Sequence, residues 1–431
     1  MRLYDEYYCK RGTRIIQGVR EKIYSYVCEL AREITQQMLQ SYDEELAKSR
    51  DKKVYRGKGK RKTSIKTVYG EVEYSRNVYR TETEDGQVAH IFLLDQAMHM
   101  DKIGLISTNL AEKIALIVTE SPYRVTAEQI SSTCGQSISA GGVWNMMQRL
   151  GERIDEEEVH AVKQMDADQT EGEKVIPVLF EEMDGVWLNI QDEHHKKMKK
   201  QEMKVFTMYE GWDEEKEKQN RSTLVNKTML AGMEKSNDFH AKREVCIRKK
   251  YAADEIGQRI LNGDGGSWIK EPYDLDTIFQ LDRYHIYQEI LRKISNKDAQ
   301  KEIRRLFDEE KMDEMLEYIQ IYATSVASTD ENDKSSKKAM ELYQYLKNNK
   351  EGLLPYDKRG INIPALEKGI HTQTDSIIIC HCLKRCRRHQ EKHLKEHLVI
   401  RTKVLSGALF GKQKRRKYHS RKTMRKLPTF T

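Results

Sequence analysis

The chain has 431 residues, of which 38% are hydrophobic and 33% are charged. No apolar run approaches the roughly 18 residues that a membrane-spanning helix needs, and the first residues lack the apolar stretch of a signal peptide. The composition therefore excludes a helical membrane protein and predicts a soluble, cytoplasmic protein with its seven scattered cysteines reduced.

The formal net charge of +8 is unevenly distributed along the chain. Residues 384–426 hold 17 Lys and Arg against only Glu391 and Glu396, and a second basic cluster lies between Lys48 and Lys66. Two basic clusters on an otherwise mildly acidic chain indicate a polyanionic partner such as nucleic acid. A solvated face or a basic tail without a partner is the alternative.

The first predicted element is one long helix from about Arg14 to Ser49. Its apolar residues recur mostly at spacings of three to five. The charged residues lie on the other face, so this helix either packs inside the protein or pairs with a second copy.

A β-hairpin is predicted over Ser64–Arg80, which is rich in Val, Tyr and Thr and has a Gly-Glu turn in its middle. Its arms are basic, and we expect them to lie along a phosphate backbone. The candidate DNA-binding residues in and before the hairpin are Lys58, Lys60, Arg61, Lys62, Lys66, Arg76 and Arg80.

The pattern from Met100 to about Glu171 is helical and contains the outline of a helix-turn-helix. Thr126 is expected to begin the first helix, Cys134-Gly135 to form the turn, and Ser137 or Ser139 to cap the second helix. An ordinary pair of antiparallel helices in an all-helical region remains the alternative to a DNA-reading motif.

The segment from Lys174 to about His285 is predicted to consist mainly of β-strands. Three strand candidates come first, then a helix over residues 253–261, then a strand at residues 277–282, which is the order of a mixed α/β sheet. Trp187, Trp212 and Trp268 are expected in its core, with base stacking as the alternative for Trp268. The charged segment from Tyr287 to about Asn349 is predicted to be helical.

Two aspartates are candidates for chemistry. Asp184 lies in a strand-like segment before Gly185, and Asp264 lies between Gly263 and Gly265. Carboxylates beside glycine can approach metal ions closely, and such groups hold the Mg²⁺ ions of phosphodiester chemistry. The alternative is that both Asp-Gly pairs are simply turns.

Three segments strengthen the catalytic interpretation, and they occur in the order FEEMDGVWLNIQ, LNGDGGSWIK and FQLDRYHIYQ. With the upstream KTSIKTVYGEVEYSRNVYR and GQSISAGGVWNMMQRLGE, they resemble the ISLre-type family of bacterial insertion-sequence transposases. That family is often described as an uncharacterised protein family and is related to the Mutator-like transposases. The resemblance covers roughly residues 10 to 370.

The resemblance implies an RNase H-like DDE core that cuts and joins DNA with two Mg²⁺ or Mn²⁺ ions. Asp184 matches the first catalytic aspartate of the family and Asp264 the second. Asp282 and His285 match a DxxH element, in which His285 would orient a ligand or contact DNA. A histidine with only a packing role is the alternative. The implied partners are the element's terminal repeats, the target DNA and further copies of the chain.

The third carboxylate departs from the family pattern, because Asp375 stands where the family has glutamate. The tail after Arg388 also lacks the family's usual segment, and a decayed or frameshifted copy would explain this. A zinc site among the Cys and His residues between Cys380 and His397 is a weak alternative, since their spacing fits no common finger.

The sequence thus predicts an α/β protein with an RNase H-like catalytic core, a mainly helical N-terminal DNA-binding region and a helical insertion. The expected divisions are a helix and basic segment (1–62), a hairpin region (63–100), a helix-turn-helix region (101–171), the core (172–295), the insertion (296–365), and the end of the core with the basic tail (366–431). The rival interpretation is a catalytically impaired remnant or a non-catalytic DNA-binding protein.

Overall fold

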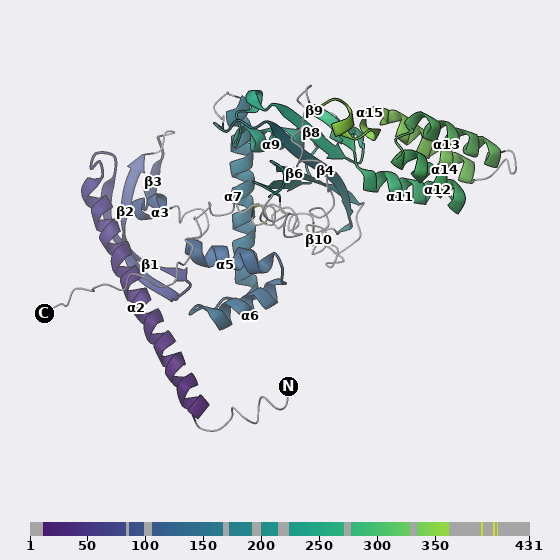
Figure 1. The fold of residues 1–431 in the computed structure, drawn as a ribbon. Coiled ribbons are helices and arrows are strands. Elements are labelled where there is room, and N and C mark those ends of the chain that lie inside the picture. Colours follow the sequence, from purple (N-terminus) through teal and green to yellow (C-terminus); the bar gives the residue numbers. More distant parts are fainter. Residues whose placement is uncertain are drawn as a thin grey trace.

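A computed structural model describes residues 12–82, 86–98, 106–166, 172–191, 200–213, 224–270, 277–327, 334–361, 389–390, 400 and 403. Figure 1 shows three parts: a long helix with a small sheet, a group of helices, and a larger sheet that continues into a helical bundle. None of the helices in these ranges combines the length and apolarity needed to cross a membrane.

The N-terminal part joins a long helix to a three-stranded antiparallel sheet in the order β1-β2-β3. The elements are α2 (Gly12–Ser49), β1 (Arg56–Thr67), β2 (Gly70–Glu82), β3 (Val88–Ile91) and α3 (Leu93–Ala97). Both the predicted long helix and the predicted hairpin are confirmed. Strand β1 begins at Arg56, earlier than the expected Ser64, because its exposed basic half has no apolar alternation that would mark it as a strand.

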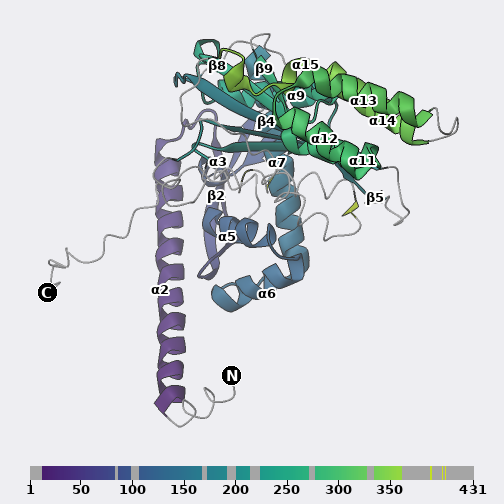
Figure 2. The same ribbon diagram turned by 45° about the vertical axis from the view of Figure 1, so that its right-hand side comes forward.

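The second part is helical, as predicted, and comprises α5 (Thr108–Val118), α6 (Tyr123–Thr133) and α7 (Ala140–Asp166). Thr126 does not begin α6: the helix starts at Tyr123, and Thr126 is fully buried within it. Ser139 is the residue that caps the next helix, because its hydroxyl accepts a hydrogen bond from the Gly142 amide at 3.0 Å. Figure 2 shows α7 running from α6 to the larger sheet.

The larger sheet has five strands in the order β7-β6-β4-β8-β9. Strands β4, β6 and β7 pair antiparallel, whereas β8 and β9 continue the sheet parallel to β4. The bounds are β4 (Val178–Leu188), β6 (Gln201–Tyr209), β7 (Thr228–Gly232), β8 (Gln258–Gly263) and β9 (Thr277–Leu281), with a short β5 (Ile190–Gln191) beside β4 in the sequence. A mixed α/β fold is therefore confirmed.

One segment of this sheet contradicts the sequence prediction. The sequence pattern predicts a helix over residues 253–261, but they contain a single 3₁₀ turn, η1 (Ala253–Glu255), followed by the buried strand β8. Arg259 is the reason for the wrong prediction, because a charged residue inside a short apolar run suggests an amphipathic helix. The helix that precedes β8 in the chain is α9 (Ser236–Arg248), which the sequence pattern does not predict.

The segment after the sheet, which the sequence predicts as a helical insertion, is helical. Its helices are α11 (Arg283–Lys293), α12 (Lys297–Asp308), α13 (Met312–Ala327) and α14 (Lys334–Asn348), with the short elements α10 (Ser267–Lys270), α15 (Lys350–Leu353) and η2 (Tyr356–Lys358) at its junctions with the sheet. Apolar residues of these helices form one core cluster that includes Leu281 at the end of β9. The insertion is therefore packed directly onto the sheet.

The basic tail is not wholly irregular. Ile400 is fully buried in the core formed by α5, α6 and α7, and Lys403 Nζ lies 2.8 Å from Glu158 Oε1 on α7. A two-residue strand, β10 (His389–Gln390), pairs with β5. Parts of the chain beyond residue 388 thus belong to the folded core.

Candidate metal site

The candidate site lies where three neighbouring strands of the larger sheet reach the same level. Met183 of β4 pairs with Gly263 of β8, and Gly263 pairs with Leu281 of β9. The residue that follows each of these is an aspartate: Asp184, Asp264 and Asp282. Strands β8 and β9 end at this level, whereas β4 continues to Leu188. Ligands of α/β sheets bind beside the carboxyl ends of parallel strands. The topology therefore gathers three aspartates from distant parts of the sequence.

Asp184, Asp264 and His285 converge closely enough to share one cation. Each offers one ligand atom, and these atoms all lie within 4.8 Å of one another. The three side chains are half-buried, so the group is shielded yet still reachable from solvent. Two carboxylate oxygens and one imidazole nitrogen suit Mn²⁺ well, and the oxygens alone suit Mg²⁺. The residues present thus fit a divalent metal ion.

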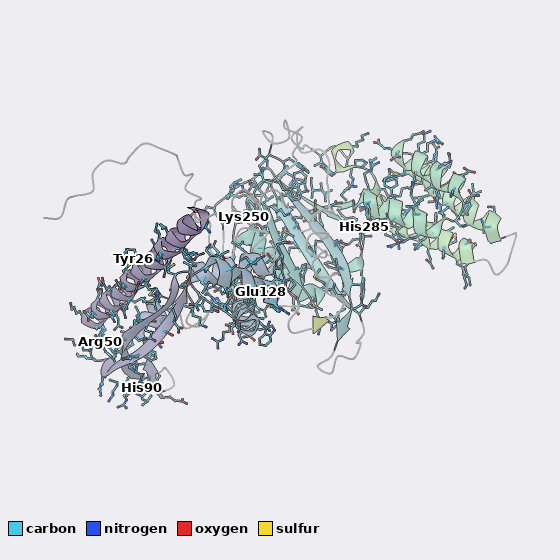
Figure 3. All side chains as sticks on the ribbon, turned by 90° about the horizontal axis from the view of Figure 1, so that it is seen from below. Tyr26, Arg50, His90, Glu128, Lys250 and His285 are labelled. Atoms are coloured by element: carbon cyan, nitrogen blue, oxygen red, sulfur yellow. The ribbon has the colours of Figure 1, made fainter. Side chains whose placement is uncertain are left out.

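His285 is oriented by the residue that caps its helix. Asp282 accepts a hydrogen bond from the Tyr284 amide at the start of α11, and its Oδ2 lies 2.8 Å from His285 Nδ1. The other ring nitrogen, Nε2, lies 3.9 Å from Asp184 Oδ1. A carboxylate that holds Nδ1–H leaves Nε2 as the metal-binding atom, which is a frequent arrangement around metal-bound histidines. Figure 3 labels His285 at the junction of the sheet and the helical bundle.

The surroundings of His285 shift its pKa. Burial disfavours the charged imidazolium, but the hydrogen bond and charge of Asp282, with the charges of Asp184 and Asp264, outweigh it and raise the pKa of His285. The site therefore attracts positive charge, whether a proton on the ring or a cation between the carboxylates.

The loop that carries Asp264 is held from the helical insertion. Tyr345 on α14 donates its hydroxyl to the Asp264 carbonyl oxygen at 2.8 Å. Gly265 follows in a left-handed conformation with φ of 82°, and a Cβ there would lie 2.6 Å from Asn349 Oδ1. Only glycine fits this close approach without strain. The sequence does not point to Tyr345 or Asn349, because nothing in their local pattern links them to a residue about 80 positions earlier.

The two Asp-Gly pairs lie in different local structures. Asp184 and Gly185 lie within the continuous strand β4 and pair with β6, so the hairpin-turn alternative is wrong for them. Asp264 and Gly265 do lie in a turn, in which Asp264 Oδ1 accepts a hydrogen bond from the Gly266 amide at 2.8 Å. A turn and a ligand role are compatible at this position, since the second carboxylate oxygen is not used by that bond.

A buried ion-pair network supports β4 beneath the site. Glu181 is fully buried, and its two carboxylate oxygens contact Arg243 of α9 and Arg259 of β8, the latter at 2.7 Å. Burial opposes ionisation of Glu181, but the two guanidinium groups lower its pKa overall. This network explains why α9 and β8 contain the charged residues Arg243 and Arg259, which make both elements hard to predict from the sequence.

The other predicted site residues fall into different environments. Of the predicted DNA contacts, Lys58, Lys60, Arg61 and Lys62 are exposed on β1, whereas Lys66 on β1 and Arg80 on β2 are half-buried. Asp375 and the segment from Cys380 to Arg388 lie outside the described residues. Four of the predicted DNA-contact residues therefore lie on the exposed part of β1, and both DNA binding and the third carboxylate stay predictions.

Two of the tryptophans expected in the core differ in their surroundings. Trp187 is 60% exposed, because it points to the face of β4 opposite its buried neighbours Val186 and Leu188. Trp268 packs edge-on against Phe239 at 6.0 Å between ring centroids, as expected for a core residue. The core assignment is thus wrong for Trp187 and confirmed for Trp268.

Arg76 differs from the other basic candidates. It is 9% exposed, forms an ion pair with Asp95 of α3, and its guanidinium carbon lies 3.8 Å from the centre of the Phe92 ring. In this conformation Arg76 ties β2 to α3 and is not available to a phosphate. It is therefore removed from the set of expected DNA contacts.

The chain belongs to a family described as an uncharacterised protein family, UPF0236, whose profile matches residues 11–419. A UPF0236 protein of Caldanaerobacter subterraneus is 25% identical over 356 residues, covering 81% of this chain and 69% of the relative. The name of that relative joins eleven locus designations of one genome. A Streptococcus gallolyticus protein named "UPF0236 protein in vanSb 3'region" is 24% identical over 367 residues, 81% of this chain and 74% of its own length. A further C. subterraneus relative is 24% identical over 315 residues, which cover 69% of this chain and 59% of the relative.

Proposed function

We propose that this protein is a DDE-type transposase of the ISLre type, related to the Mutator-like enzymes, which cuts the ends of an insertion sequence and joins them to target DNA. The observation that carries the proposal is the convergence of ligand atoms of Asp184, Asp264 and His285 within 4.8 Å, beside the carboxyl ends of β8 and β9. Carboxylates grouped in this way hold the cations of enzymes that cut phosphodiester bonds.

The topology of the sheet supports the same proposal. Strands β4, β6 and β7 follow one another in the sequence and pair antiparallel. Strands β8 and β9 then run parallel to β4, and helix α9 connects β7 to β8. This is the arrangement expected of an RNase H-like core. Asp184 lies on the first strand and Asp264 follows the fourth. These are the two residues that the resemblance assigns as the first two catalytic aspartates.

The comparison with C. subterraneus adds an independent argument. One protein name there covers eleven loci, and a second covers four. A gene repeated at many places in one genome is what a mobile element leaves behind. A housekeeping enzyme or a single transcriptional regulator would not explain that number of copies.

We propose the following roles for the residues of the site, and its geometry supports them. Asp184 and Asp264 would hold a divalent cation, with His285 Nε2 as a third ligand and Asp282 fixing the ring. Such a cation lowers the pKa of an attacking water or 3′-hydroxyl and neutralises charge on the leaving oxygen. Asp375 is the candidate third carboxylate, which together with Asp184 and Asp264 would hold the two ions.

DNA binding is proposed for the exposed face of β1. Lys58, Lys60, Arg61 and Lys62 present four cations along one exposed stretch of strand. Contacts between such side chains and phosphates position DNA without reading its sequence. The region of α6 and α7 is the candidate for reading the terminal repeats. We propose that the basic tail adds further phosphate contacts.

The test is a reaction with purified full-length protein, Mg²⁺ or Mn²⁺, and labelled DNA that carries the ends of the element around the gene. The proposal predicts 3′-end nicks and joined products for the wild type, and neither for Asp184→Asn, which should still bind the DNA. The control is Asp254→Asn, which replaces an aspartate whose side chain is 78% exposed on η1, away from the candidate site.

Each alternative gives a different result in that experiment. Nicks without joined products would indicate a nuclease of the RNase H type. Binding without any product, in both wild type and Asp184→Asn, would indicate a DNA-binding remnant and contradict the proposed activity.

A further inference from the structure

The first half of α2 carries a stripe of large apolar side chains exposed to solvent. These residues are 44–59% exposed, except Tyr26 at 68%, and they are Val19, Ile23, Tyr26, Val27, Leu30 and Ile34. In Figures 1 and 2 this half of the helix extends past β1 and α6 toward the N-terminus, and Figure 3 labels Tyr26 on it. Contiguous exposed apolar side chains of this kind mark an interaction surface.

The opposite face of α2 accounts for its packing within the chain. Cys28, Leu39 and Asp43 are buried there, and Asp43 Oδ2 accepts hydrogen bonds from the backbone and side chain of Asn77 on β2. At about 100° per residue these positions centre about half a turn away from the exposed stripe. The helix thus has two apolar faces, and the hairpin occupies only one of them.

The stripe has the spacing of a coiled coil. Val19, Ile23, Tyr26 and Leu30 follow one another at intervals of four, three and four residues, which is the a/d repeat of paired helices. Ile34 extends the apolar surface by one further turn. The segment from Val19 to Ile34 is about 24 Å long at about 1.5 Å per residue, which is enough for several layers of side chains between two helices.

Charges beside the stripe distinguish the direction of pairing. Lys22 and Glu29 lie seven residues apart, so they occupy the same flank of the seam. In an antiparallel pair in which Ile23 of one helix packs against Tyr26 of the other, Lys22 of each helix faces Glu29 of its partner. The two-fold symmetry of such a pair repeats the contact between Lys22 and Glu29, so the dimer contains it twice. A parallel, in-register pair would bring neither charge near its opposite.

We propose that α2 is a homodimerisation helix, which pairs antiparallel with α2 of a second copy of this chain through the stripe from Val19 to Ile34. The occupant is a second copy because the stripe is complementary to itself in both apolar spacing and charge. This inference is independent of the metal site, since none of its residues belongs to that site.

The experiment measures the mass of the full-length protein by sedimentation equilibrium or light scattering over a range of concentrations. The wild type is expected to be dimeric, and Ile23→Glu and Leu30→Glu are expected to be monomeric under the same conditions. The control is Ser25→Glu, which adds a charge to an exposed residue of the same helix outside the stripe. Circular dichroism melting of every variant checks that the fold is retained.

Charge exchange tests the direction of pairing. Lys22→Glu and Glu29→Lys should each weaken the dimer, and the double variant should restore it to the wild-type dissociation constant. A wild type that is monomeric at tens of micromolar, or a dimer unaffected by Ile23→Glu, would overturn the proposal. A double variant no tighter than the single ones would overturn the antiparallel register.

Discussion

At the scale of single residues, His285 of the DxxH motif is a proposed metal ligand whose pKa can be tested. Its raised pKa means that the folded protein favours the imidazolium above the ordinary value of 6.5. The stabilisation is fully present below that value and is lost as the pH rises through the folded pKa. We predict that His285→Gln lowers the free energy of unfolding of the metal-free protein at pH 6, and that its deficit shrinks at higher pH. Urea denaturation in EDTA measures this, and a deficit that grows with pH would contradict the assignment.

Arg76 differs from His285, because its charge forms an ion pair with Asp95 inside the fold and has no proposed role in chemistry. Truncating one partner of a buried ion pair leaves the other charge uncompensated and costs about 3–5 kcal/mol. Arg76→Met should therefore destabilise the protein by about that amount, whereas Arg61→Met on the exposed strand should change stability by less than about 0.5 kcal/mol. Denaturant unfolding of the two variants measures the difference. Equal stabilities would show that the ion pair with Asp95 contributes little.

At the scale of elements, α14 contacts the Asp264 loop through Tyr345, and we expect this contact to position the loop. Tyr345→Phe removes one hydrogen bond to the Asp264 carbonyl oxygen, which is worth about 1 kcal/mol of stability. Residues that orient metal ligands typically change metal affinity about 10- to 100-fold, so we expect Mn²⁺ binding to weaken by at least about 10-fold. Tyr343→Phe on the same helix is the matched control. Titration with Mn²⁺ measures both, and identical affinities would contradict the positioning role.

The elements also show how much of the fold the sequence predicts. Strands β4, β6, β7 and β9 are predictable because their apolar runs are short and bounded by polar residues. Strand β8 is not, because Arg259 is neutralised by Glu181, a partner 78 positions earlier. Asp184 and Asp264 are identifiable through motif resemblance. Their proximity to His285 depends on strand order, which no local pattern contains.

At the scale of the whole molecule, the proposed DNA-binding surface and the proposed metal site belong to separate sheets. Replacing Lys58, Lys60, Arg61 and Lys62 by Gln should weaken DNA binding and reduce the dependence of log affinity on log salt concentration by roughly one for each phosphate that is no longer neutralised. Mn²⁺ affinity should be unchanged in this variant, because β1 belongs to the small N-terminal sheet and not to the sheet that carries the metal site. Fluorescence anisotropy at several salt concentrations measures the slope. An unchanged slope would place the DNA-binding surface elsewhere.

The measurement that most directly tests the central claim is Mn²⁺ binding to the purified full-length protein, followed by electron paramagnetic resonance. We expect saturable binding in the wild type and in the exposed-site control Asp254→Asn, with affinity at least about 10-fold lower in Asp184→Asn and in Asp264→Asn. A nitrogen coupling to the bound ion should be present in the wild type and absent in His285→Ala. If both aspartate variants bind Mn²⁺ as tightly as the wild type, these residues do not form a metal site and the proposed chemistry is wrong.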